Sequence, residues 1–226
     1  MLGIISAMNV ELESIKELMV DIKGKSISNI NFYQGKINNK EVVIAVCGIG
    51  KVFAAICAQT MILNYEVDSI LNVGVGGSLS EKLDVASVAI SSSLVQHDMD
   101  TSPLGDPVGL ISGINIVNIP ADNNISLKVE NILQKIGINN EIGVIASGDQ
   151  FINSKQKKEY IKSTFNAIAC EMEGAAIAQV CYVNKVPFCV IRAISDNADG
   201  NSHVDYSAFV KIAVKNTTRL IDEYTK

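Results

Sequence analysis

Residues 2–19 read LGIISAM followed by NVELESIKELM, an apolar run of strand length joined directly to a segment of helical period. Asn9 stands where a residue could cap the helix. Four apolar residues recur at the spacing of one helix face: Leu12, Ile15, Leu18 and Met19. The stretch therefore predicts a strand over residues 2–8 and a helix after it, the first unit of a β-then-α series.

The rest of the chain continues this alternation. Strand-like runs at 30–37 and 42–47 flank Asn38-Asn39-Lys40, a turn signal typical of an antiparallel hairpin. Further strands are expected at 67–73, 85–95, 142–146, 167–170 and 187–194, and helices at 51–64, 125–136, 154–164, 172–184 and 206–224. A stretch rich in Asp, Pro, Gly and Asn, about 97–124, is expected to be a long loop. This order predicts one α/β domain over residues 1–226, with a mixed central β-sheet flanked by helices on both faces.

Composition narrows the class of partner. With 19 basic and 24 acidic side chains, a net charge of −5 and no basic stripe, nucleic acid is not an expected partner.

The five cysteines form no CxxC pair, which argues against a disulfide framework, a zinc site or another metal centre. The longest stretch without charged residues, between Asp106 and Asp122, is too short and polar to span a membrane. The N-terminus lacks the basic region of a signal peptide, so a cytoplasmic protein with reduced cysteines is expected.

Two neighbouring runs, Glu171-Met172-Glu173 and Arg192-Ala-Ile-Ser195-Asp196, bring three carboxylates and one of the chain's two arginines into a short apolar region. Carboxylates beside apolar strands are expected to be partly desolvated. Desolvation can lift one of them toward the protonated state that acid catalysis needs at neutral pH.

Residues just after each predicted strand are the first candidates for a site, because ligands of α/β sheets bind at the carboxyl ends of strands. Four segments qualify: Met8 to Glu11, Gly74-Val-Gly-Gly77, Ser147-Gly-Asp-Gln-Phe-Ile152, and Ser195-Asp196. Structural roles compete at each of them. The glycines could form a tight turn, Glu11 could serve the helix macrodipole, and Ser195-Asp196 could be turn or cap chemistry.

Other residues have equally plain alternatives. Met8, Ile49, Phe151 and Met172 could pack in the core. His97 and His203 each lie beside an acid, but the sequence contains no GxSxG elbow, so a Ser-His-Asp triad is disfavoured.

Taken together, these segments resemble the nucleoside phosphorylase superfamily, specifically the bacterial 5′-methylthioadenosine/S-adenosylhomocysteine nucleosidases. The resemblance covers nearly the whole chain. It rests on Gly3 to Met8 with Glu11, Gly48 to Lys51, Gly74 to Gly77, Ser147 to Asn153, Glu171 to Glu173, and Arg192 to Asp196. It implies hydrolysis of the bond between adenine and a 5′-thio-substituted ribose, without a cofactor.

The resemblance also implies roles for individual residues. Asp196 would be the acid that protonates adenine at N7, Glu11 the base that activates water, and Glu173 the clamp on the ribose hydroxyls. Phe151 would stack on the purine while the backbone of Ile152 reads its edge. The remaining residues that the resemblance assigns to the substrate pocket are Met8, Ile49, Gly77, Leu104, Met172, Arg192, Ser195 and Tyr206.

Relatives are homodimers in which a long loop completes the neighbour's pocket, and here the matching loop is 96–106, with Leu104 where phenylalanine is often found. Ile49 and Tyr206 would complete an apolar pocket for methylthio or homocysteinyl groups. At Val75 many relatives carry a serine that hydrogen-bonds near the acid, which valine cannot do. The chain is more similar to a subgroup in which some members also cleave aminodeoxyfutalosine.

Two other functions compete with this one. A phosphorolytic purine nucleoside phosphorylase would need cationic clamping of phosphate, yet the sequence has only Arg192 and Arg219, the latter in the predicted terminal helix. A catalytically silent nucleoside-binding protein would not need Glu11 and Asp196. Because the chain has so few arginines to clamp a phosphate, water is the expected nucleophile.

Overall fold

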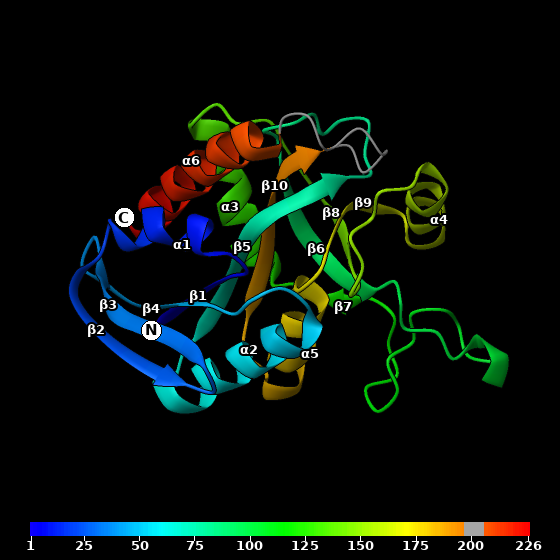
Figure 1. The fold of residues 1–226 in the computed structure, drawn as a ribbon, viewed down its shortest axis with the longest axis horizontal. Coiled ribbons are helices and arrows are strands. Elements are labelled where there is room, and N and C mark those ends of the chain that lie inside the picture. The colour runs from blue at the N-terminus through cyan, green and yellow to red at the C-terminus, as the bar shows by residue number, and fades with distance from the viewer. Residues whose placement is uncertain (197–205) are drawn as a thin grey trace.

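The computed structural model describes residues 1–196 and 206–226, with the helical backbone alone at 206–210. Ten strands in this part of the chain form one mixed sheet (Figure 1). They are β1 (Leu2–Ser6), β2 (Val20–Ile27), β3 (Ile30–Ile37), β4 (Lys40–Val46), β5 (Ser69–Ser78), β6 (Val88–Gln96), β7 (Ile119–Pro120), β8 (Asn140–Ser147), β9 (Ala167–Glu171) and β10 (Phe188–Asp196).

The sheet closes on itself at one end. Its order is β10-β6-β8-β9-β5-β1-β4-β3-β2, with β7 paired to β6 outside this order. β10 also pairs in parallel with β5, so that β5, β9, β8, β6 and β10 form a ring. β1 and β4 extend the sheet in parallel from β5, and the β3–β4 hairpin is antiparallel. The carboxyl ends of β1, β4, β5 and β10 therefore lie at the same edge of the sheet.

Helices cover both faces of the sheet. In Figure 1, α1 (Asn9–Lys16), α3 (Asn123–Lys135) and α6 (Tyr206–Thr225) lie on one face, and α2 (Lys51–Tyr65) and α5 (Gly174–Asn184) on the other. Each layer buries its own cluster of apolar side chains against the strands, and α4 (Lys155–Phe165) covers a third cluster beside β8 and β9. The predicted α/β class, with a mixed sheet flanked on both faces, is confirmed. No helix in the described ranges is long and apolar enough to cross a bilayer.

The structure corrects three predictions of local structure. β2 was not predicted, because this edge strand is exposed along nearly its whole length and its apolar alternation stops after Val20 and Ile22. It pairs with β3. The first helix ends at Lys16, so Leu18 and Met19 lie beyond it, and its cap is Met8 instead of Asn9. Gly74–Gly77 is not a turn, since β5 continues through it to Ser78.

The long loop after β6 is also shorter than expected, because α3 already begins at Asn123 and the short strand β7 lies inside the predicted loop. It includes the 3-10 helix η1 (Ser102–Leu104). Figure 1 shows this green segment projecting away from the body of the molecule. Leu104 consequently lies far out on the surface, with 83% of its area exposed.

Gly76 tests how closely the strands of the ring approach each other. A Cβ there would lie 3.0 Å from the carbonyl oxygen of Cys170 and 3.3 Å from Cβ of Arg192, and neither can move freely. We expect Gly76→Ala to lower the free energy of unfolding by about 1–3 kcal/mol, measured by urea denaturation. Gly24→Ala, in the exposed edge strand β2, is the matched control, because its Cβ would meet only the Tyr33 ring at 3.5 Å. Equal stability of the two variants would contradict this account.

Candidate active site

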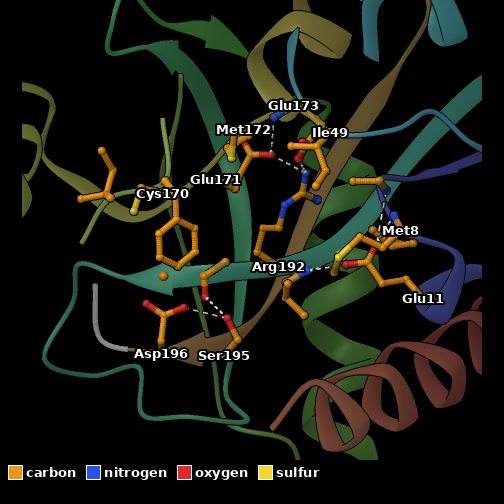
Figure 2. A pocket seen from close by; sticks show the side chains of 18 of the residues that line it. Met8, Glu11, Ile49, Cys170, Glu171, Met172, Glu173, Arg192, Ser195 and Asp196 are labelled. Carbon is orange, nitrogen blue, oxygen red and sulfur yellow. Dashed lines mark hydrogen bonds and ion pairs between the residues drawn. The ribbon is translucent and has the colours of Figure 1, made fainter. Parts of the chain in front are cut away.

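A pocket lies where the carboxyl ends of the strands meet (Figure 2). Its walls come from the segments after β1, β4, β8 and β9 and from the ends of β5 and β10. Eleven of the thirteen site residues predicted from the sequence line it: Met8, Glu11, Ile49, Gly77, Phe151, Ile152, Met172, Glu173, Arg192, Ser195 and Asp196. Segments far apart in the sequence thus contribute to one site.

Two predicted site residues are not part of this wall. Leu104 does not line the pocket of its own chain, because the loop that carries it projects away from the sheet edge. Tyr206 begins α6, and its side chain lies outside the described residues.

Glu11 is held in the pocket by backbone N–H groups. It lies in the first turn of α1, where Oε2 accepts hydrogen bonds from Met8 at 3.0 Å and Ala7 at 3.2 Å, while Oε1 accepts one from Val75 on β5 at 3.1 Å. The residue is only 4% exposed. Burial raises the pKa of Glu11, and these hydrogen bonds, together with the charge of Arg192, oppose that rise. Glu11 caps its helix and also presents a carboxylate to the pocket.

The glycines of β5 allow this close approach. A Cβ on Gly74 would lie 3.1 Å from Oε1 of Glu11 and 3.6 Å from the guanidinium carbon of Arg192. Any side chain at this position would push these two charged groups away from the strand. The glycine run therefore serves close packing in the site and not a turn.

Glu173 lies at the start of α5, directly after β9, and is buried. Its Oε1 accepts a hydrogen bond from the N–H of Gly50 at 2.9 Å, and Oε2 lies 3.8 Å from Nη2 of Arg192. Burial, reinforced by the negative charge of Glu171, raises the pKa of Glu173 to about 7. Near neutral pH this carboxyl group can exchange a proton.

The resemblance implies no role for Glu171, but this residue lines the pocket and is among its most highly bonded groups. It forms an ion pair with Arg192 and accepts hydrogen bonds from Ser147 Oγ and from the N–H groups of Glu173 and Gly174. Burial raises its pKa, but Arg192 and these donors outweigh burial and leave the pKa of Glu171 below its ordinary value. Arg192 was the sequence signal that could have revealed this role, because an arginine on a buried strand needs a carboxylate partner.

Asp196 is the last residue of β10 and lies beside Gly77 of β5. Ser195 Oγ donates a hydrogen bond to Asp196 Oδ2 at 2.9 Å and lies 3.4 Å from the carbonyl oxygen of Gly76. Val75, which lacks a hydroxyl group, supplies only its backbone N–H, to Glu11. A hydroxyl next to the aspartate is therefore present without a serine at position 75.

The mouth of the pocket is apolar and partly open. Ile49 and Phe151 are 59% and 57% exposed. Lys51 holds two of the surrounding loops together, because its Nζ pairs with Asp98 at 2.6 Å and its N–H donates to Asp149 at 2.8 Å. An apolar group entering the pocket here would contact Ile49 and Phe151.

Further pocket residues were not predicted. One of them is Cys170, and the signal that could have found it is its place at the end of a predicted strand. Another is Gln150, which lies within the candidate segment Ser147 to Ile152. Burial raises the pKa of the Cys170 thiol to about 12, so a neutral thiol faces the pocket. His97 is buried near Gly148, outside the pocket lining, and His203 lies outside the described residues.

The chemistry available in the pocket is that of several separate carboxyl groups. Glu11 and the Ser195–Asp196 pair lie at separate places in Figure 2, with Arg192 between them. Among the described residues that line the pocket, Arg192 is the only cation. Carboxyl groups held apart in this way can divide proton donation and proton abstraction between them.

Comparisons with known proteins agree with this arrangement. The model of the phosphorylase superfamily matches residues 1–226. The 5′-methylthioadenosine/S-adenosylhomocysteine nucleosidase of Staphylococcus carnosus is 38% identical over 227 residues, covering 100% of this chain and 99% of that protein.

Solved structures are similar over nearly the same length. A Helicobacter pylori MTAN mutant with 5′-methylthioadenosine in the active site is 36% identical with a TM-score of 0.92, covering 98% of both chains. The futalosine hydrolase of Helicobacter pylori is 37% identical with a TM-score of 0.92, covering 98% of this chain and 97% of that one. Because the family model and these relatives match from end to end, the chain belongs to the phosphorylase superfamily.

Proposed function

We propose that this protein hydrolyses the N-glycosidic bond of 5′-methylthioadenosine and S-adenosylhomocysteine, and also of 5′-deoxyadenosine, and releases adenine. The observation that carries the proposal is a pocket lined by Glu11, Glu173 and Asp196, in a chain similar end to end to nucleosidases of this substrate class. Such an enzyme would serve methionine salvage.

The proposed mechanism follows from how charge develops in the reaction. Cleavage builds positive charge on the sugar and negative charge on the leaving base. Asp196, oriented by Ser195, would donate a proton to adenine. Glu11, anchored by three backbone N–H groups, would deprotonate the attacking water.

The other pocket residues would bind the substrate. Glu173 would accept hydrogen bonds from the ribose hydroxyls, with Met172 against the sugar. Phe151 would stack on the purine while the Ile152 backbone reads its edge, and Ile49 would contact the 5′ group. Met8, Gly77 and Arg192 would complete the walls.

Water is a better nucleophile for this pocket than phosphate. Arg192 is fully buried and engaged with Glu171 and Asn72, which leaves no cationic clamp among the described residues of the pocket. Arg219, on α6, donates instead to the carbonyl oxygen of Ile136. These contacts favour hydrolysis over phosphorolysis.

Aminodeoxyfutalosine is a second candidate substrate. The 37% identity to a futalosine hydrolase lies between the 36% and 38% identity to the two nucleosidases. The half-exposed Ile49, which would contact the 5′ group, leaves that side of the pocket open to a larger group. Side-by-side assays with methylthioadenosine and aminodeoxyfutalosine would rank the two.

We further propose a homodimer in the cytoplasm. An apolar surface, the α2/α5 face, extends over two adjoining helices and consists of Val52, Phe53, Ile56, Leu63, Tyr182 and Val183. A patch of this kind is typical of a protein interface. In such a dimer, loop 96–106 with Leu104 would complete the partner subunit's pocket. All five cysteines are free and buried, which suits a reducing compartment.

Removal of the proposed acid should separate binding from chemistry. We expect Asp196→Asn to lower adenine release from methylthioadenosine by about 10²- to 10⁴-fold in phosphate-free buffer, because the amide cannot supply the proton. Nucleoside binding, measured by calorimetry, should persist. Asp84→Asn, at an exposed position outside the pocket, is the matched control. Strict dependence of the wild type on added phosphate, with ribose-1-phosphate as a product, would overturn the hydrolase proposal.

Substrate binding should depend on pH through Glu173. Its raised pKa of about 7 means that the ionised form is present above this pH and is lost as the pH falls through it. Because the ionised carboxylate is the better acceptor for ribose hydroxyls, KM for methylthioadenosine should rise below about pH 7. Glu173→Gln should raise KM above about pH 7 and remove this dependence. A KM for the wild type that stays constant across the neutral range would contradict the proposed clamp.

The α2/α5 face can be tested by charge. Val52 is 70% exposed in the single chain, so Val52→Glu should leave the fold intact but place an unpaired charge in the proposed interface. We expect sedimentation velocity to show a dimer for the wild type and a monomer for this variant. Val20→Glu, at an exposed valine of β2, should remain dimeric. A dimer that survives the Val52 substitution would place the interface elsewhere.

A further inference from the structure

Glu171 is the carboxylate of the pocket that the proposed reaction leaves without a role. It ends β9, and its side chain is 2% exposed. Glu173, two residues on, has a proposed contact with the ribose, and Glu11 and Asp196 have proposed parts in proton transfer. Burying one more ionised group is costly unless it is fully compensated, so its bonding partners indicate what it does.

Each oxygen of Glu171 has at least two donors. Oε2 accepts from Nη2 of Arg192, from the N–H of Glu173 at 3.0 Å and from the N–H of Gly174 at 2.8 Å. Oε1 accepts from Ser147 Oγ and from the N–H of Gly174 at 3.0 Å. One carboxylate therefore ties three elements together: the end of β8, the start of α5 and the arginine of β10.

Arg192 connects Glu171 to the proposed ribose clamp. Its Nη2 forms the close ion pair with Glu171 and a 2.6 Å hydrogen bond with Asn72 Oδ1, but lies 3.8 Å from Oε2 of Glu173. The guanidinium is thus engaged mainly by Glu171 and stays outside hydrogen-bonding distance of Glu173. In Figure 2 the two glutamates face Arg192 from the same end of the pocket.

We propose that Glu171 is a positioning residue, an inference that rests on the proposed function. It holds Arg192 away from full pairing with Glu173 and fixes the start of α5, which carries Glu173. The carboxylate of Glu173 is thereby available to accept hydrogen bonds from the ribose hydroxyls, because it is not fully paired with the arginine.

The charges around Glu173 are consistent with this role. Glu171 from β9, Arg192 from β10, Glu11 from α1 and the Cys47 thiol after β4 face it, and the Gly50 N–H donates to it. After burial itself, the charge of Glu171 is the largest influence that raises the pKa of Glu173, while Arg192 lowers it. Loss of the Glu171 charge would remove the repulsion that raises the pKa of Glu173. It would also release Arg192 to pair more closely with Glu173, which would lower that pKa further.

Glu171→Gln tests the proposal with nearly unchanged side-chain volume. We expect the pKa of Glu173 to fall by about one pH unit or more, because an opposite charge at this range lowers a carboxyl pKa. The rise in KM on acidification should move to lower pH with it. Isotope-edited NMR of the glutamate carboxyl carbons, assigned with Glu173→Gln, measures the pKa directly. An unchanged pKa of Glu173 in folded Glu171→Gln would overturn the proposal.

Ser147→Ala is the matched control. It removes another buried partner of Glu171 but keeps the charge and the pair with Arg192, so the pKa of Glu173 should stay near its value in the wild type. A shift as large as that of Glu171→Gln would indicate general disruption and overturn the specific role. If Glu171→Gln does not fold, Glu171→Asp withdraws the carboxylate from Arg192 and should shift the pKa in the same direction by less.

The NMR titration also separates the two proposals. Failure of the wild type to release adenine would overturn the proposed function, yet the pKa of Glu173 in the variants would still show whether Glu171 controls the arginine. Normal turnover with an unshifted pKa would overturn the positioning role alone.

Discussion

Arg192 is a fully buried guanidinium, and the construction of the pocket depends on how its charge is compensated. Glu171 pairs with it directly, Glu173 lies 3.8 Å away, and the negative charge of Glu11 also acts on it. Removal of one partner from a buried ion pair costs about 3–5 kcal/mol, because the other charge is left uncompensated. The three carboxylates are therefore constrained as a group by one cation.

The strand ring supplies the place for this cation. β10 lies between β5 and β6, and its pairing with β5 sets Arg192 beside Gly74 and Asp196 beside Gly77. Glycines at these positions leave room for the guanidinium and for the Glu11 carboxylate, which a Cβ on Gly74 would approach within 3.6 Å and 3.1 Å. The sheet thus places Arg192 and Asp196, while backbone N–H groups of the segments after β1 and β4 hold Glu11 and Glu173.

Most of the fold could be predicted from local pattern. The apolar runs and helical periods located nearly every helix and strand, and residues after strand ends proved to be the pocket residues. β2 escaped because an edge strand that is exposed along nearly its whole length carries only a weak apolar pattern. The role of Glu171 escaped because its partner Arg192 lies on another strand, 21 residues further along the chain.

By itself the sequence determined the α/β class, the candidate carboxylates and the scarcity of arginine, since these follow from residue type, spacing and count. The tertiary structure alone decided which carboxylate meets the arginine, which glycine makes room for it, and that Leu104 lies away from the pocket of its own chain. The physical reason is that desolvation and ion pairing act through distances between residues far apart in the chain, and only the closed strand ring sets those distances.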